Sequence, residues 1–230
     1  MKGDSGMATR EQFVGVISGI WETQSESLQH LATRAENVRR IDRKWFWTVL
    51  LNSFLTYGGS ANLNIKRQRF GDQLTWAKIC ALSDHGRSLL FWELPNNRFR
   101  NPTAQNIEFA FQYIFRNGGP CNAAMIYLAI EDGALRMIYL RTFRGIGAKY
   151  SRNIPMDVRD ELVLDSVALD HRLHALLDVV EDAPSRSPYT LREEYLRGVC
   201  AEVRLPDMWF LDRLLYNYYT AIKIALQELA

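Results

Sequence analysis

The segment best suited to chemistry is a lysine that follows a turn containing two glycines. The sequence there reads Gly145-Ile-Gly147-Ala-Lys149. Glycine tolerates positive φ and lets another backbone approach closely. The amides at the start of the next helix, with the helix dipole behind them, suit a phosphate group, sometimes through a bridging cation. A plain turn between helices with a glycine C-cap is the alternative for these glycines taken alone.

A carboxylate follows this segment, in the stretch Val167-Ala-Leu-Asp170-His171-Arg172. An aspartate that ends an apolar triplet is typical of a helix N-cap, because its side chain accepts hydrogen bonds from the first amides of the helix. An N-cap is the interpretation of Asp170 that the residues support on their own.

The cysteines and histidines exclude several kinds of site. Cys80, Cys121 and Cys200 are far apart and odd in number, so we expect no disulfide framework and no paired cysteines for zinc or an iron–sulfur cluster. Only His171 and His174 lie close together among the histidines, and they lack a third ligand. We expect no metal site and no cofactor, apart from a monovalent cation at the hairpin.

The overall charge decides little about partners. The formal net charge is +2 and the pI is about 8.4, which is less basic than many DNA-binding domains. Basic residues cluster at 39–44, 66–69 and 98–100. Each cluster is typical of a solvated face, and together they are compatible with a track for a phosphate backbone.

The sequence predicts a protein that does not enter a membrane. No apolar run reaches the length of a membrane span, and the polar stretch from Met1 to Gln12 has no signal-peptide core. We therefore expect a cytoplasmic, nucleoid-associated location, and we expect a monomer.

The pattern of apolar residues predicts an all-α fold of roughly ten helices, without the alternation typical of strands. Glycines at 58–59 and 118–119 are predicted breaks, and Pro155 is expected to kink or end the helix after the hairpin. The other predicted helices are one after the capping box Thr9–Gln12, Trp45 to Tyr57, Thr103 to Phe115, Ala134 to Thr142, one after a second capping box Thr190–Glu193, and Pro206 to Glu228.

The two segments with Lys149 and Asp170 closely resemble the signature of the endonuclease III and 8-oxoguanine DNA glycosylase superfamily. In that family a helix-hairpin-helix of the form L-x-x-x-x-G-[VI]-G-x-K is followed by [VI]-x-[VL]-D. The strong match covers residues 140–177, whereas residues 45–140 and 190–230 match only in helix pattern and length. The cysteine cluster of endonuclease III is absent here, which favours relatives without an iron–sulfur cluster.

The resemblance implies two catalytic side chains. Lys149 corresponds to the lysine that attacks C1′ of the target nucleotide, expels the base and forms a Schiff base, after which β-elimination cleaves the strand. This chemistry needs a neutral amine, so apolar burial or nearby cations would have to favour that form. Asp170 corresponds to the aspartate that stabilises oxocarbenium-like charge on the sugar, and a helix N-terminus keeps such a carboxylate ionised.

The resemblance also implies contacts with DNA. Gly145 and Gly147 correspond to the hairpin glycines that hold a phosphate. Many members have a histidine two residues after the aspartate, where this chain has Arg172, with His171 just before it. A guanidinium can bind phosphate as well.

A weaker parallel lies in the segment Asn62-Leu-Asn64-Ile65-Lys-Arg67, which is similar to the asparagine-rich turn of 8-oxoguanine glycosylases. There an asparagine fills the gap left by the extruded base, and an arginine faces the orphaned partner. Asn62 and Arg67 are the corresponding residues, and a plain polar loop is the alternative.

The fold implied by the resemblance has two helical lobes with a DNA-binding cleft between them, one at residues 45–158 and one at residues 1–44 with 159–230. The implied function is a bifunctional glycosylase and abasic-site lyase on double-stranded DNA with a modified base, with 8-oxoguanine favoured. Alternatives are a monofunctional glycosylase for another modified base, hypermodified phage bases included, a non-catalytic helix-hairpin-helix DNA-binding module, and an α-helical interaction protein.

Overall fold

A computed structural model describes residues 7–41, 44–56, 60–95 and 100–230, except for the side chains of residues 41 and 60–62. In these ranges the regular structure is helical and no β-strand forms, so the predicted all-α class is confirmed. Thirteen α-helices are present there, more than the roughly ten predicted. None of the described helices combines the length and the apolar character needed to cross a membrane.

The chain divides into two compact units. We call residues 37–158 the hairpin unit, and residues 1–36 together with 159–230 the terminal unit. The helix α1 (Arg10–Ile41) contributes most of its length to the terminal unit. Each unit has its own buried apolar residues.

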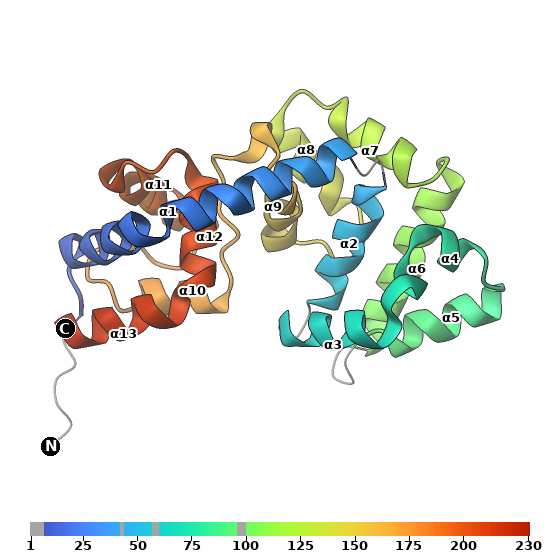
Figure 1. Cartoon of the computed structure of the whole chain (residues 1–230), viewed down its shortest axis with the longest axis horizontal. Helices are drawn as coiled ribbons and strands as arrows, with labels where there is room; N and C mark the ends of the chain where they lie inside the picture. The colour runs from blue at the N-terminus through green and yellow to red at the C-terminus, as the bar shows by residue number, and fades with distance from the viewer. Residues whose placement is uncertain (1–6, 42–43, 57–59, 96–99) are drawn as a thin grey trace, which may run out of the picture. The chain divides into compact units, whose positions relative to one another are not determined.

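The hairpin unit is built around one apolar helix. The helices of this unit can be followed in Figure 1, and they are α2 (Trp45–Leu55), α3 (Ser60–Phe70), α4 (Trp76–Cys80), α5 (Asp84–Glu93), α6 (Arg100–Arg116), α7 (Pro120–Leu128), α8 (Gly133–Arg141) and α9 (Ala148–Asp157), with a 3-10 turn η1 (Gly71–Leu74). The central helix is α2, which contacts α3, α6, α7 and α9. It is buried nearly all round, as its almost uninterrupted apolar sequence predicts.

Aromatic rings fill much of this core. Phe46 of α2 lies 5.7 Å from Phe143, and Trp45 lies 5.8 Å from Tyr127, both measured between ring centroids. Rings of this size bury large apolar areas and prefer such edge-on or tilted contacts. Because Phe143 directly precedes the turn that carries the two glycines, this packing fixes the turn to the centre of the unit.

The terminal unit holds η3 (Glu161–Val163), α10 (His171–Leu177), α11 (Tyr189–Val203), α12 (Met208–Asn217) and α13 (Tyr219–Leu229) beside α1. The predicted capping box at the start of α1 is confirmed, since the Thr9 amide donates to Gln12 Oε1 at 2.7 Å and the Gln12 amide donates to Thr9 Oγ1 at 3.2 Å. An isolated parallel bridge between Ala8 and Val180 ties the start of the described chain to the segment after α10.

Two predicted helix starts are wrong. The helix predicted from Thr103 begins at Arg100, because Pro102 fits the first turn, where no amide is needed. The second capping box does not form. Pro188 is the N-cap of α11, and Glu193 instead accepts a hydrogen bond at 3.1 Å from the amide of Val167.

Two further predictions about helix length are wrong. The single helix expected from Pro206 to Glu228 is divided into α12 and α13, and Asp207 caps the first of them through the amides of Trp209 and Phe210. Pro155 does not end the helix as expected, since α9 continues to Asp157. Pro155 lies in the last turn of α9, so the helix runs only two residues beyond it.

Candidate functional site

The glycine-containing segment forms a helix-hairpin-helix turn between α8 and α9. Ile146, between the two glycines, is 4% exposed and belongs to the aromatic and aliphatic core of the hairpin unit. Its amide donates to the carbonyl of Phe143 at 2.9 Å. Gly145 and Gly147 are exposed on either side. The turn is therefore anchored by its middle residue and presents the backbone of its glycines to solvent.

The two glycines serve the turn in different ways. Gly145 has φ of +91°, a conformation that favours glycine. Gly147 has φ of −94° and is the N-cap of α9, and a Cβ added there would meet nothing within 4 Å. Gly145 thus uses the positive φ that glycine tolerates, whereas Gly147 does not. The absence of a side chain at Gly147 leaves the N-terminus of α9 accessible, and the dipole of that helix favours an anion there.

Lys149 is the second residue of α9 and is half-buried. Its Nζ lies 5.1 Å from the centroid of the Tyr150 ring. The Tyr150 hydroxyl in turn lies 3.2 Å from Oγ1 of Thr56, just past the end of α2. The side chain of Lys149 therefore stands beside an aromatic ring that the central helix holds in place.

A polar pocket of about 340 Å³ opens along the same helix. Asn153 and Asp157 of α9 line it, and the amide nitrogen of Asn153 donates to Asp157 Oδ2 at 3.1 Å. Residues four apart lie on one face of a helix, so Lys149, Asn153 and Asp157 share a face of α9. The opposite wall comes from α2 and α3 and includes Asn52 and Arg67. The pocket can offer both hydrogen-bond donors and acceptors to a polar ligand.

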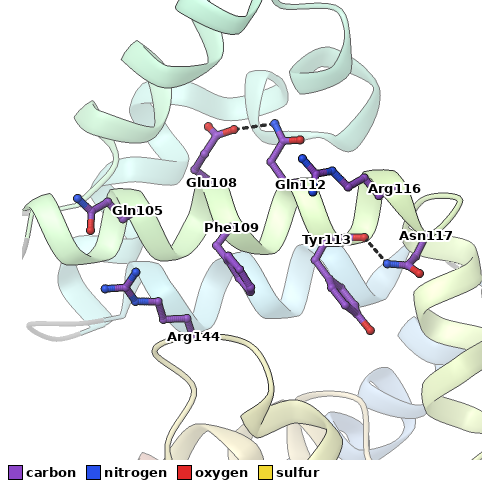
Figure 2. A pocket seen from close by; sticks show the side chains of 8 residues that line it. All are labelled: Gln105, Glu108, Phe109, Gln112, Tyr113, Arg116, Asn117 and Arg144. Carbon is purple, nitrogen blue, oxygen red and sulfur yellow. Dashed lines mark hydrogen bonds between the residues drawn. The ribbon is translucent and has the colours of Figure 1, made fainter.

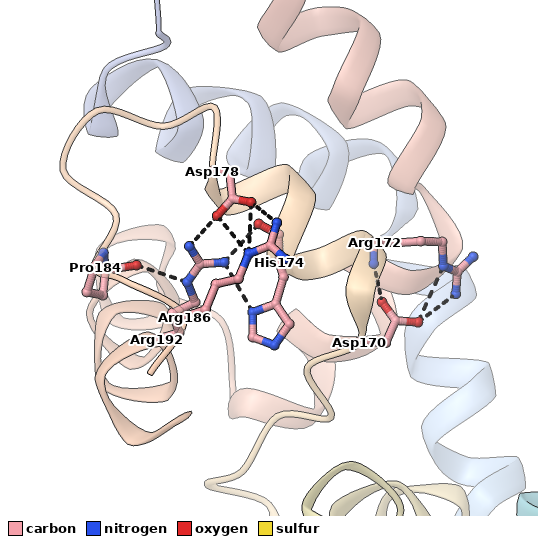
Figure 3. A network of polar contacts seen from close by, with 7 residues as sticks. All are labelled: Asp170, Arg172, His174, Asp178, Pro184, Arg186 and Arg192. Carbon is pink, nitrogen blue, oxygen red and sulfur yellow. Dashed lines mark hydrogen bonds and ion pairs between the residues drawn. The ribbon is translucent and has the colours of Figure 1, made fainter. Parts of the chain in front are cut away.

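Asp170 is the N-cap of α10, as predicted from the sequence. Its Oδ1 accepts hydrogen bonds from the amides of Arg172 at 3.0 Å and Leu173 at 3.1 Å. Its Oδ2 lies 3.3 Å from the guanidinium of Arg172 (Figure 3). The residue is only 9% exposed, and its contacts are those that stabilise an ionised carboxylate.

Arg172 is engaged within the terminal unit. Its guanidinium carbon lies 4.7 Å from the centroid of the Tyr216 ring and 5.7 Å from that of Tyr219. Burial alone would lower the pKa of Arg172, but the Asp170 carboxylate and the Tyr216 hydroxyl hold it above its ordinary value. His171, the other predicted DNA contact in this segment, is exposed at the start of α10.

Searches by sequence find no protein-family model and no curated protein that match this chain. Two solved structures match it closely in three dimensions. One is the 8-oxoguanine glycosylase/lyase of Methanocaldococcus jannaschii in complex with 15mer DNA containing 8-oxoguanine, with a TM-score of 0.69 and 18% identity over 90% of this chain and 97% of the other. The second is the 8-oxoguanine DNA glycosylase of Thermotoga maritima, with a TM-score of 0.67 and 17% identity over 91% of this chain and 96% of the other.

This chain shares its fold with these two 8-oxoguanine DNA glycosylases. The likeness covers 90% of the chain and therefore extends over both units. Lys149 belongs to the hairpin unit and Asp170 to the terminal unit, and their cooperation stays a prediction.

In this glycosylase fold the asparagine-rich segment is helical. Both Asn62 and Arg67 lie in α3, so the turn and the polar loop considered for this segment are both wrong. Arg67 is exposed and lines the polar pocket, and the side chain of Asn62 lies outside the described residues. Their roles against a DNA duplex stay predictions.

A polar network that the sequence did not reveal connects the end of α10 to α11 (Figure 3). Arg192, only 2% exposed, donates to the carbonyls of Pro184 and His174 and to the Asp178 carboxylate. It also lies 3.1 Å from His174 Nδ1, and because a guanidinium can only donate, this nitrogen must accept. The network therefore requires a histidine that is not doubly protonated.

Two pKa shifts follow from this network. Burial, and next the charge of Arg192, lower the pKa of His174. Hydrogen bonds from Arg186 and Arg192 lower the pKa of Asp178 to about 2 although its partial burial opposes them. The sequence did not reveal this network because its partners are 8 to 18 residues apart, beyond the spacing of one or two helical turns. Among the described residues, no group of three or more histidine, cysteine or acidic residues is arranged to hold a metal ion.

Proposed function

We propose that this protein is a DNA glycosylase that removes a damaged or modified base from double-stranded DNA, with 8-oxoguanine as the favoured substrate. One observation carries the proposal. Lys149 stands in the first turn of α9 directly after an exposed glycine hairpin. It does so in a chain whose fold matches an 8-oxoguanine glycosylase/lyase over 90% of its length.

In this proposal the amine of Lys149 attacks C1′ of the target nucleotide, and the bond from C1′ to the base breaks. The base leaves with a proton, and ring opening of the sugar gives a Schiff base between C1′ and Nζ. Loss of a proton from C2′ then expels the 3′ phosphate and cleaves the strand, and hydrolysis frees the lysine. Asp170, held ionised by two amides and a guanidinium, supports the positive charge that develops on the sugar.

The exposed glycines of the hairpin would bind a phosphate of the same strand, directly or through a monovalent cation. Arg172 and His171 would contact the backbone from the terminal unit. An enzyme that reaches C1′ must draw the nucleotide out of the stack. Asn62 is proposed to occupy the gap, and Arg67, an exposed residue of the polar pocket, is proposed to face the partner base rather than the extruded base.

The polar pocket beside Lys149 is proposed to receive the extruded base. It lies along the face of α9 that carries the amine, and its volume of about 340 Å³ is within the range of pockets that bind small ligands. The amide of Asn153 and the carboxylate of Asp157 can pair with the edge of a purine that carries both donors and acceptors.

Release of the free base from duplex oligonucleotides tests this proposal. The duplexes carry 8-oxoguanine, thymine glycol or an abasic site, and the proteins are the wild type, Lys149→Gln, Asp170→Asn and the control Lys78→Gln, which changes an exposed lysine of α4. We expect release and strand cleavage with 8-oxoguanine, loss of both in Lys149→Gln and retention in Lys78→Gln. Release that survives Lys149→Gln would indicate a monofunctional enzyme. Binding without release from any duplex would indicate a non-catalytic module.

A further inference from the structure

A second concave surface of the hairpin unit is not used by the proposed reaction. It is a groove of about 510 Å³ formed by one face of α6 and by Arg144 from the hairpin turn. Figure 2 shows that the rings of Phe109 and Tyr113 leave α6 on the side of Arg144. We call it the α6 groove. Its residues differ in kind from those of the polar pocket, because they include two aromatic rings and two arginines, Arg116 and Arg144.

The aromatic part of the groove is held rigidly. Tyr113 packs edge-on against Phe143, with 5.3 Å between ring centroids, and Phe143 is 1% exposed. Arg144 follows Phe143 directly in the chain, so this contact fixes the position of Arg144 opposite α6. Phe109, by contrast, is 50% exposed. A flat apolar ring is thus presented to solvent on a preformed support.

The charged part of the groove favours an anion. Arg116 and Arg144 are exposed, and neither forms an ion pair or a hydrogen bond with the other residues that the structure describes. The one carboxylate of the lining, Glu108, accepts a hydrogen bond from Gln112 at 2.9 Å and lies 3.8 Å from Nε of Arg87. Arg87, which also pairs with Asp84, offsets part of the charge of Glu108, and the two guanidiniums of Arg116 and Arg144 line the same groove.

We propose that the α6 groove binds a nucleotide of single-stranded DNA, whose base stacks on Phe109 while Arg144 and Arg116 hold its phosphates. A base in a duplex has both faces covered by its neighbours, so only an unpaired base can stack on this ring. Aromatic platforms beside cationic grooves are the usual means of binding single strands. The inference rests on the proposed function for one step, the binding of a DNA phosphate at the hairpin. Because Arg144 directly precedes Gly145, a strand whose phosphate is held there passes the entrance of the groove.

The proposal predicts that an unpaired strand next to the bound duplex adds affinity. Equilibrium binding would be measured by fluorescence anisotropy for a blunt duplex and for the same duplex with a single-stranded thymidine tail at either end. The readout is the ratio of the two dissociation constants. The proteins are the wild type, Phe109→Ala, Phe109→Trp, Arg144→Gln and the control Phe115→Ala. Phe115 is an equally exposed phenylalanine of α6 that does not line the groove.

We expect the tail on one end to tighten binding by about 5- to 150-fold in the wild type, the range given by stacking of one base. Phe109→Ala should lose this advantage, and Phe109→Trp should keep it because the ring face remains. Arg144→Gln should lower the slope of log K against log salt by about 0.7 on the tailed duplex, the value for one single-strand phosphate. Phe115→Ala should keep the ratio of the wild type.

The proposal is overturned if the wild type gains nothing from a tail on either end, or if Phe109→Ala keeps the gain. It is also overturned if Phe115→Ala loses as much as Phe109→Ala, because the effect would then lie in the helix rather than in the groove. Base release from the blunt duplex is measured in parallel. If the tail tightens binding but no base is released, the proposed glycosylase activity is refuted and the proposed role of the α6 groove is supported. If base is released but the tail does not tighten binding, the role of the α6 groove is refuted and the glycosylase activity is supported.

Discussion

Replacement of Asp170 by alanine and by asparagine separates its structural role from its chemical role. The alanine variant loses the cap of α10, which accepts hydrogen bonds from the amides of Arg172 and Leu173. Loss of such a cap costs about 0.5–2 kcal/mol. The partner guanidinium is 34% exposed, so loss of that ion pair adds at most about 1 kcal/mol. We expect Asp170→Ala to lower the free energy of unfolding by about 1–3 kcal/mol.

The asparagine variant should be much closer to the wild type in stability. Asparagine caps helices as well as aspartate does, because its side-chain oxygen can still accept both amide bonds. Its charge is gone, so it cannot stabilise the oxocarbenium-like sugar, and base release should fall steeply. Thermal unfolding followed by circular dichroism measures the first effect, at about 2–4 °C for each kcal/mol in a chain of this length.

Either of two results would refute this reasoning. If Asp170→Asn unfolds at as low a temperature as Asp170→Ala, the side chain does not act as the cap seen in the structure. If Asp170→Asn releases base at the rate of the wild type, the negative charge of Asp170 has no part in the reaction.

The hairpin and the polar network give three further predictions. Gly145→Ala should lower the free energy of unfolding, measured in denaturant titrations, by about 1–2 kcal/mol because alanine is strained at the positive φ of this position. Gly147→Ala should leave the free energy of unfolding unchanged and weaken duplex binding. Equal losses of unfolding free energy in the two variants would contradict this. Ile146→Ala should cost about 2–5 kcal/mol in the same titrations, since it leaves a cavity in the core. Because the pKa of His174 is lowered in the folded protein, the unfolded chain takes up a proton at higher pH than the folded chain does. The stability that the neutral His174 contributes is therefore complete above pH 6.5, and it is lost as the pH falls through the pKa of the folded state. His174→Asn should flatten that slope in unfolding measured across the pH range, and an unchanged slope would assign it to other groups.

Features with a local cause could be predicted from the sequence. The apolar run of α2, the capping box at Thr9, the turn at Gly145 and the cap at Asp170 each depend on residues within one or two turns of one another. The helix α3 could not, because its sequence is polar and has no apolar stripe. It is fixed by a few contacts, such as the burial of Phe70 in the core.

The chemistry of the candidate site could be predicted from the sequence only where it depends on residues close together in the chain. Lys149 and its hairpin follow a compact spacing, whereas the partners of Arg172 come from α12 and α13 and no local pattern indicates them. The capping box predicted at Thr190 failed because Glu193 finds a buried partner in another segment, the amide of Val167. Such long-range contacts override local preferences, and they also form the polar pocket, whose lining comes from several helices.

Borohydride trapping tests the central claim most directly, because reduction would capture a Schiff base formed on Lys149. The wild type, Lys149→Gln and Lys78→Gln would each be incubated with duplex DNA carrying 8-oxoguanine or an abasic site and then reduced. We expect a covalent protein–DNA adduct with the wild type and with Lys78→Gln, and none with Lys149→Gln. An adduct that persists in Lys149→Gln, or the absence of any adduct with the wild type on either duplex, would contradict the account.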